Sequence, residues 1–278
     1  MPPSSTASSQ QVATAPTKTS FDFRDGLPYW LIVMLGIIGF MVFQVIVNDA
    51  YREAYTEILP GLKLTLIVTV GSFVASMVLG LIIGIARVSS NRVLETVARV
   101  YIEFVRGMPM LVWLFLIALV LTPDMVDLIN KIFGSDVKTR SVSFAWRGAI
   151  ALCLFYAAFL AEVFRAGIQS VDHGQMEAGK ALGLTDRHVL RKITLPQAFR
   201  NTLPAFGNDL IALMKDTSLI SVIAGAELTY HARIYSGSSF RFREAFFVLA
   251  VFYVTLTLIL SLLLQVWERH LEIPGRAE

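Results

Sequence analysis

The chain has 278 residues, of which 55% are hydrophobic and 16% charged, and its mean hydropathy is +0.63. Soluble domains carry about 25% charged residues, so a soluble enzyme fits this composition poorly. The formal net charge of +3 comes from basic residues scattered between apolar runs, without the dense basic patch typical of nucleic-acid binding. A single cysteine, Cys153, excludes an internal disulfide. The composition therefore predicts an integral membrane protein, and several uncharged runs of about the 20 residues that a helix needs to span a bilayer predict an all-α fold.

The chain opens with a polar segment followed by an apolar one. Residues 1–28 are rich in Ser, Thr, Gln, Ala and Pro, which bury too little apolar surface to offset the entropy of ordering, and predict a disordered tail. The run Tyr29–Val47 lies far from the start and lacks both a basic flank and a small-residue cleavage site. It is therefore expected to be a retained membrane anchor and not a removable signal peptide.

Two later runs are long and free of charge. Leu64–Ala86 and Ala245–Trp267 each exceed the roughly 20 residues that a helix needs to cross a bilayer. A third run, Gly107–Pro123, is shorter and is expected to extend backward through Tyr101. A fourth, Gly148–Ala161, reaches spanning length only by including charged residues on one of its two sides.

The last predicted span, Leu203–Gly225, is interrupted by Asp209, Lys215 and Asp216, so these charges must face a polar cavity. The total is about six transmembrane helices, which places both termini on the same side. That side carries more Lys and Arg, so the positive-inside rule predicts cytoplasmic termini.

The longest charged loop, residues 175–204, reads as helix, break, helix. Gly183 is the residue type that ends a helix in the left-handed conformation. Thr185 can cap a second helix, which should stop before Pro196 because the residue preceding a proline is disfavoured in the α region. The residues alone leave two roles open, since a basic helical hairpin can lie on anionic headgroups or dock into a partner.

The spacing within this loop resembles the EAA motif of ABC importer permeases, which is EAA, three residues, G, nine residues, then I-x-LP. The residues that carry the match are Glu177, Ala178, Gly179, Gly183, Ile193, Leu195 and Pro196. Gly179 stands where the family usually has Ala, a change expected to weaken a helix by about 1 kcal/mol.

Further segments are similar, in order, to the polar amino acid uptake permeases. They are GLKLTLIVTV, ARVSSNR, FVRGMPM, AEVFRAGIQSV, LPQAFRNTLP and KDTSLISVI. The resemblance runs from Gly61 to about Trp267. The departures are Met108, where Thr or Val is common, and the additional anchor at Tyr29–Val47.

The resemblance implies a type I importer, with a transmembrane domain at residues 61–267, a cytoplasmic coupling loop at 171–202 and a cytoplasmic tail at 268–278. Its expected partners are two cytoplasmic ATPases, a second permease subunit, identical or related, and an external solute-binding protein. The ATPases would use ATP and Mg²⁺, and this chain would form the path for an amino acid by alternating access. The expected location is the bacterial cytoplasmic (inner) membrane.

Catalytic chemistry has little support in the sequence. No G-x-x-x-x-G-K-[ST] loop occurs, so the chain is not expected to hydrolyse ATP itself. The four histidines lack the spacing of metal ligands. They are His173, His188, His231 and His270. We therefore expect no catalytic, metal or cofactor site on this chain.

Ionisable residues in predicted spans are functional candidates, because burying charge in a membrane is costly. Asp209 and Asp216 lie seven apart on one helical face, with Lys215 adjacent. A zwitterionic amino acid needs an anion for its ammonium and a cation for its carboxylate, and this segment supplies both. The competing interpretation is that these charges stabilise helix packing or the subunit interface.

Two other sites carry charge near the predicted spans. Glu162 and Arg165 stand three apart and can neutralise each other. Arg106 precedes Gly107-Met108-Pro109, which resembles a broken helix start, and it can anchor at headgroups or line the translocation path.

Two other functions remain as alternatives. A secondary transporter or channel would use the intramembrane charges as ion relays, and a membrane scaffold would use none. Neither needs a cytoplasmic helix-Gly-helix loop of this spacing.

Overall fold

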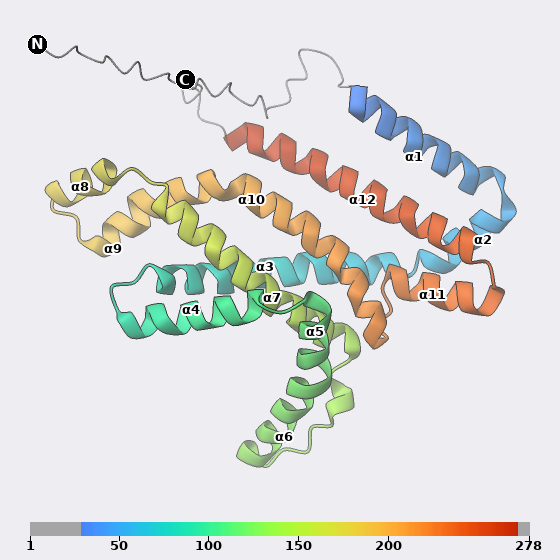
Figure 1. Ribbon diagram of the computed structural model, residues 1–278, viewed down its shortest axis with the longest axis horizontal. Coiled ribbons are helices and arrows are strands. Elements are labelled where there is room, and N and C mark those ends of the chain that lie inside the picture. Colours follow the sequence, from blue (N-terminus) through green and yellow to red (C-terminus); the bar gives the residue numbers. More distant parts are fainter. Residues whose placement is uncertain (1–28, 272–278) are drawn as a thin grey trace, which may run out of the picture.

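The computed structural model describes residues 29–271, and every regular element in that part of the chain is a helix (Figure 1). The α-helices are α1 (Tyr29–Val47), α2 (Asp49–Ile58), α3 (Gly61–Arg87), α4 (Arg92–Arg106), α5 (Met110–Phe115), α6 (Thr122–Phe133), α7 (Phe144–Gln169), α8 (His173–Ala181), α9 (Asp186–Val189), α10 (Leu195–Asp216), α11 (Leu228–Ser239) and α12 (Phe242–Leu271). Short π-helical segments are η2 (Leu116–Leu121) and η4 (Leu190–Thr194), and 3-10 segments are η3 (Thr139–Ser141) and η5 (Thr217–Ile223).

Helix α1 has the bounds that the sequence predicts for the additional anchor. It packs against α12 and α2 through a narrow face that includes the buried residues Leu31 and Val45, and most of its other side chains are exposed. Asn48 caps α2, which leaves α1 at an angle of 101°. The predicted tail at residues 1–28 and the final residues 272–278 lie outside the described part of the chain, and residues 268–271 continue α12.

Helices α3 and α7 form the most closely packed pair. The hydroxyls of Ser72 and Ser76 each donate to a backbone carbonyl of α7 at 3.0 Å. A Cβ atom added at Gly80 or Gly84 would lie 2.9 Å from atoms of α7. Small residues let the two backbones meet, and membrane helices associate through such packing because lipid offers them little hydrophobic driving force.

The predicted start of the third span, Gly107–Pro123 extended backward through Tyr101, is wrong. The structure ends α4 at Arg106 and begins the next helix at Met110, so the span extends forward to Phe133 and not backward through Tyr101. Pro109 has an extended backbone and cannot donate a helical hydrogen bond, which explains the interruption. The broken helix start predicted around Gly107 is confirmed.

The arm made of α5, η2 and α6 projects away from the other helices (Figure 1). Arg147, which is buried at the start of α7, holds this arm in place through hydrogen bonds. Its guanidinium donates to the carbonyls of Ala118 at 3.1 Å, Thr139 at 2.6 Å and Val142 at 2.9 Å. Carbonyl oxygens thus solvate a buried cation that forms no ion pair with any residue the structure describes.

Four helical segments are long and apolar enough to cross a membrane, and α1 with α2 gives a fifth if the bent pair is one span. The four segments are Gly61–Arg87, Met110–Phe133, Phe144–Gln169 and Phe242–Trp267. The remaining predicted span is α10, which is continuous but too polar to pass the same test. Together these helices agree with the predicted total of about six.

The predicted stop before Pro196 is wrong. The π-helical segment η4 leads directly into α10, and Pro196 occupies the first turn of that helix. Pro196 has no N–H to donate to the carbonyls of η4, and the wider π-helical turn directly before it is where the continuous helix departs from the α-helical hydrogen-bond pattern.

Candidate functional site

The segment after α7 folds into a helical hairpin of α8, a turn and α9, at one end of the molecule (Figure 1). Gly183 has a φ of +79°, so its predicted left-handed conformation is confirmed. Its N–H donates to the Lys180 carbonyl at 2.9 Å, and the Leu184 N–H donates to the Gly179 carbonyl at 3.1 Å. These two bonds complete a Schellman motif, which satisfies the carbonyls at the end of α8.

The second helix of the α8–α9 hairpin begins after Thr185, as predicted. The Thr185 hydroxyl, however, pairs with Nδ1 of His188 at 2.8 Å and caps no backbone N–H. Lys180 Nζ lies 2.8 Å from the Asp186 carboxylate across the turn. This hydrogen bond raises the pKa of Lys180 above its ordinary value. The turn is therefore held by one backbone motif and by side-chain contacts on its exposed surface.

Gly179, the departure from the EAA pattern, lies inside the hairpin. A Cβ atom there would lie 2.6 Å from Cδ1 of Ile193 and 3.2 Å from Cγ2 of Val189. The missing side chain lets α8 approach α9 and η4 closely. Glu177 and Ala178 are exposed on the outer surface of α8. The motif residues thus divide into a buried set that shapes the hairpin and an exposed set available to a partner.

A second feature is a cavity of about 620 Å³ between the end of α4, α7 and α10. Its charged lining residues are Arg106, Glu162, Arg165 and Asp209. Three of the five residues predicted for the substrate path are therefore brought together here. They come from three helices, and nothing in their sequence spacing alone indicated that they share a cavity.

The Glu162 carboxylate is neutralised within the protein. It lies 2.8 Å from Nη2 of Arg165, which confirms the predicted pair, and 4.0 Å from Nε of Arg87. Arg87 in turn lies 2.9 Å from the Glu95 carboxylate. This network joins α3, α4 and α7 at one side of the cavity.

Asp209 and Arg106 are different, because neither forms an ion pair with a described residue. Oδ2 of Asp209 is buried and has no hydrogen-bond partner among the described residues. The Arg106 guanidinium lies 5.6 Å from the centre of the Phe159 ring and forms no ion pair with a described residue. The cavity therefore contains one anion and one cation that the protein leaves without an ionic partner.

The other two predicted path residues do not line the cavity. Oδ2 of Asp216 accepts a hydrogen bond from the Tyr156 hydroxyl at 2.7 Å, and Lys215 is exposed. This geometry favours the packing interpretation for Asp216. Two cations share the cavity with Asp209, Arg106 and the paired Arg165, and Lys215 is not among them.

The cavity and the hairpin both lie in a region with known relatives. Residues 76–273 match the family described as "Binding-protein-dependent transport system inner membrane component". The chain belongs to this family. It is therefore a multi-pass protein of the inner membrane.

Individual relatives carry more specific names. The chain is 34% identical over 224 residues to a probable amino-acid permease protein, YxeN, of Bacillus subtilis, covering 81% of this chain and 95% of the relative. It is 35% identical over 225 residues to the glutamine transport system permease protein GlnP of Escherichia coli, covering 81% of this chain and 97% of that protein. A crystal structure of an amino acid ABC transporter matches with a TM-score of 0.65 at 35% identity, covering 77% of this chain and 94% of that chain.

Sequence reasoning missed several lining residues of the cavity in this family member. Phe159, Ser170, Asn201 and Thr202 line it but carry no signal of their own, since aromatic and hydroxyl residues are common in membrane helices. Arg165 was recognised only as the partner of Glu162. The approach of α7 to α10 reveals these residues, and a sequence pattern does not encode that approach.

Proposed function

We propose that this chain is the permease subunit of an ATP-driven amino acid importer. The observation that carries the proposal is the cavity in which Asp209 and Arg106 lack ionic partners. Its location within the family match, and the amino acid permeases among the relatives, support the same conclusion.

The cavity suits a free amino acid. An α-ammonium group can bind the Asp209 carboxylate, and an α-carboxylate can bind the Arg106 guanidinium through two parallel hydrogen bonds. The volume of about 620 Å³ lies within the range of small-molecule sites. The hydroxyl oxygens of Ser170 and Thr202, whose protons are donated to backbone carbonyls, add acceptors for a polar substrate side chain. Both ions of the zwitterion would then be paired inside the membrane, which offsets their desolvation.

The α8–α9 hairpin couples this chain to the ATPase subunits that drive transport. It docks on a cytoplasmic ATPase subunit, so the hairpin and both termini face the cytoplasm. The ATPases bind ATP and Mg²⁺ and hydrolyse ATP, while this chain, in a dimer with a second permease subunit, switches between inward-open and outward-open states. An external solute-binding protein delivers the amino acid. The switch requires contacts that differ between the two states, and the hairpin transmits that difference.

A strained variant of the hairpin tests the coupling role. Gly183→Val places a β-branched residue in the left-handed region, which costs about 1–2 kcal/mol and misaims the hairpin. We expect normal membrane insertion with uptake of labelled amino acid lost and ATPase copurification weakened. Glu177→Lys, on the exposed surface of α8, should act in the same direction.

Gly134→Val is the matched control, because Gly134 also has a left-handed backbone, with φ of +61° and open space around it. It imposes the same backbone strain far from the hairpin and should retain uptake. Full transport by the Gly183→Val protein would overturn the coupling role. Absence of any ATPase from a mild-detergent preparation of the unaltered protein would favour a secondary transporter.

A further inference from the structure

The turn between α11 and α12, at the end of the molecule opposite the α8–α9 hairpin, holds an unusual aromatic residue (Figure 1). Phe240 has a left-handed backbone with φ of +58°, and its side chain is 81% exposed. Among the described residues, only Phe240 and Ala224 are non-glycine residues with positive φ; Phe240 follows the end of α11 and Ala224 follows the end of η5.

Folding alone does not account for a phenylalanine at this position. The residue that follows a helix in the left-handed conformation is usually Gly or Asn, because other side chains crowd the backbone there. An exposed ring gains little packing that would offset the strain. Residues held in strained conformations cluster at binding and switch sites, which points to a role outside the fold of this chain.

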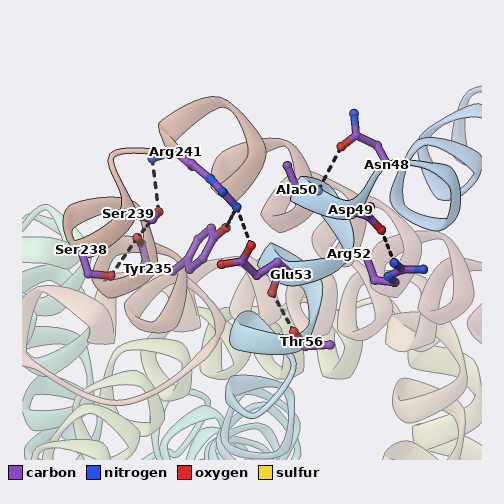
Figure 2. Close-up of polar contacts among 10 residues, drawn as sticks. All are labelled: Asn48, Asp49, Ala50, Arg52, Glu53, Thr56, Tyr235, Ser238, Ser239 and Arg241. Carbon is purple, nitrogen blue, oxygen red and sulfur yellow. Dashed lines mark hydrogen bonds and ion pairs between the residues drawn. The ribbon is translucent and has the colours of Figure 1, made fainter.

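The turn is fixed in place by its neighbours (Figure 2). Arg241 donates to the Glu53 carboxylate of α2 at 2.5 Å and to the Tyr235 hydroxyl at 3.4 Å. Its backbone N–H donates to the Ser239 hydroxyl at 3.3 Å, and that hydroxyl donates to the Tyr235 carbonyl at 2.7 Å. The contacts on both sides of Phe240 therefore fix the backbone from which its exposed ring projects.

A groove of about 320 Å³ lies beside this turn, between α2 and α11. Its lining includes Ser238 and Ser239, which directly precede Phe240, together with Glu53, Glu57 and His231. Glu53 is balanced by Arg241, whereas Glu57 is exposed and has no ion-pair partner among the described residues. The groove therefore presents one unbalanced negative charge next to an aromatic side chain.

We propose that Phe240 and this groove form the docking surface for the external solute-binding protein. The proposal rests on the proposed function, which supplies such a partner at the end opposite the hairpin. Phe240 inserts into an apolar pocket of that protein, and a Lys or Arg beside the pocket enters the groove and pairs with Glu57. Rigid aromatic side chains that fill a partner's pocket are typical binding hot spots.

The charges of the groove itself favour a protein partner. Phosphate headgroups would be repelled by Glu57 there, and Arg241, the cation next to Phe240, is paired with Glu53. Arg243, in the first turn of α12, is exposed and forms no ion pair with a described residue, so lipid contact through this cation is an outcome that the test separates.

The test measures binding of the purified external solute-binding protein to the complete transporter in lipid nanodiscs. Phe240→Gly removes the ring and relieves the backbone strain, so a loss of binding cannot be attributed to misfolding. We expect the Kd to rise about 10- to 30-fold. Phe240→Tyr keeps the aromatic ring and should stay within about twofold of the unaltered protein. Glu57→Lys should slow association, with the largest effect at low salt.

The matched control is Phe242→Ala, which removes a neighbouring ring that is 54% exposed in the first turn of α12 and should leave the Kd unchanged. Unchanged affinity of both Phe240→Gly and Glu57→Lys would overturn the docking surface. So would a loss of nanodisc insertion at normal affinity, which would indicate lipid contact. ATPase copurification and ATP hydrolysis without the solute-binding protein report on the proposed function separately, because neither involves this turn.

Discussion

The two faces of α7 are built for different purposes. Toward α3, the helix meets Gly80 and Gly84 at backbone distance and accepts hydrogen bonds from serine hydroxyls. Toward α10, it presents Phe159, Glu162 and Arg165 to a cavity. The face toward α3 is close-packed, whereas the face toward α10 borders a cavity and carries charged side chains.

The difference shows how one helix can be both a rigid support and the wall of a binding site. Close packing of small residues holds α7 in one position against α3, because interiors packed to this density deform little. The polar face can then keep charged groups at fixed places without contributing to the packing itself. Changes on the two faces should therefore separate cleanly into losses of stability and losses of transport.

The largest effect is expected on the packed face. Gly84→Val adds a branched side chain where even a Cβ atom would lie 2.9 Å from the Ala161 carbonyl oxygen of α7. Overpacking of this kind costs about 1–3 kcal/mol. We expect a lower thermal unfolding midpoint in detergent and a reduced yield of folded protein. Gly71→Val is the matched control in the same helix, because nothing lies within 4 Å of a Cβ atom there. An equal loss from both variants would contradict the packing argument.

The next effect is expected on the polar side, at the unpaired ions. Asp209→Asn removes the anion for the substrate ammonium, and we expect the affinity for the transported amino acid to fall about tenfold. The unfolding midpoint should not fall, because the buried oxygen has no partner to lose. Binding to the purified transporter and thermal unfolding are measured side by side, with Lys215→Gln, outside the cavity, as the control. Loss of stability at normal affinity would instead assign Asp209 to packing.

A smaller effect is expected at Glu162, because neighbouring arginines already neutralise its charge. Glu162→Gln breaks the ion pairs with Arg165 and Arg87, and partly exposed pairs of this kind contribute on the order of 1 kcal/mol. We expect a modest fall in the unfolding midpoint and a change in substrate affinity of less than about threefold. An affinity loss as large as that of Asp209→Asn would show that Glu162 contacts the substrate directly.

The smallest effect is expected within the α8–α9 hairpin. Gly179→Ala restores the residue common in the EAA motif, and its methyl group meets two side chains at close range, the flexible end of Ile193 and, at 3.2 Å, Cγ2 of Val189. The helix gains up to about 1 kcal/mol from alanine, offset by the movement of these side chains. We expect stability within about 0.5 kcal/mol and normal uptake. A clear loss of uptake would show that the close approach of the two helices is needed for coupling.

The elements that were predicted correctly carry local signals. The bounds of α1 follow from one uninterrupted apolar run, and the left-handed conformation of Gly183 follows from a glycine placed between two helical patterns. The errors in the predicted helix bounds occur at prolines. Pro109 sets the start of a span and Pro196 fails to end one, and the difference lies in the π-helical segment that precedes Pro196. Such a π-helical segment depends on how the flanking helices pack, and no residue type in the sequence predicts it.

The sequence by itself determined that this is a helical membrane protein of the importer family, because hydropathy and the spacing of the EAA residues are properties of consecutive positions. Tertiary structure decided which charges act together. Arg106, Glu162 and Asp209 belong to three helices and meet only because α7 packs against both α4 and α10. It also separated Asp216, which pairs with Tyr156, from Asp209 on the same helix. Whether a carboxylate is paired depends on atoms from distant parts of the chain, so only the packed structure distinguishes these two residues.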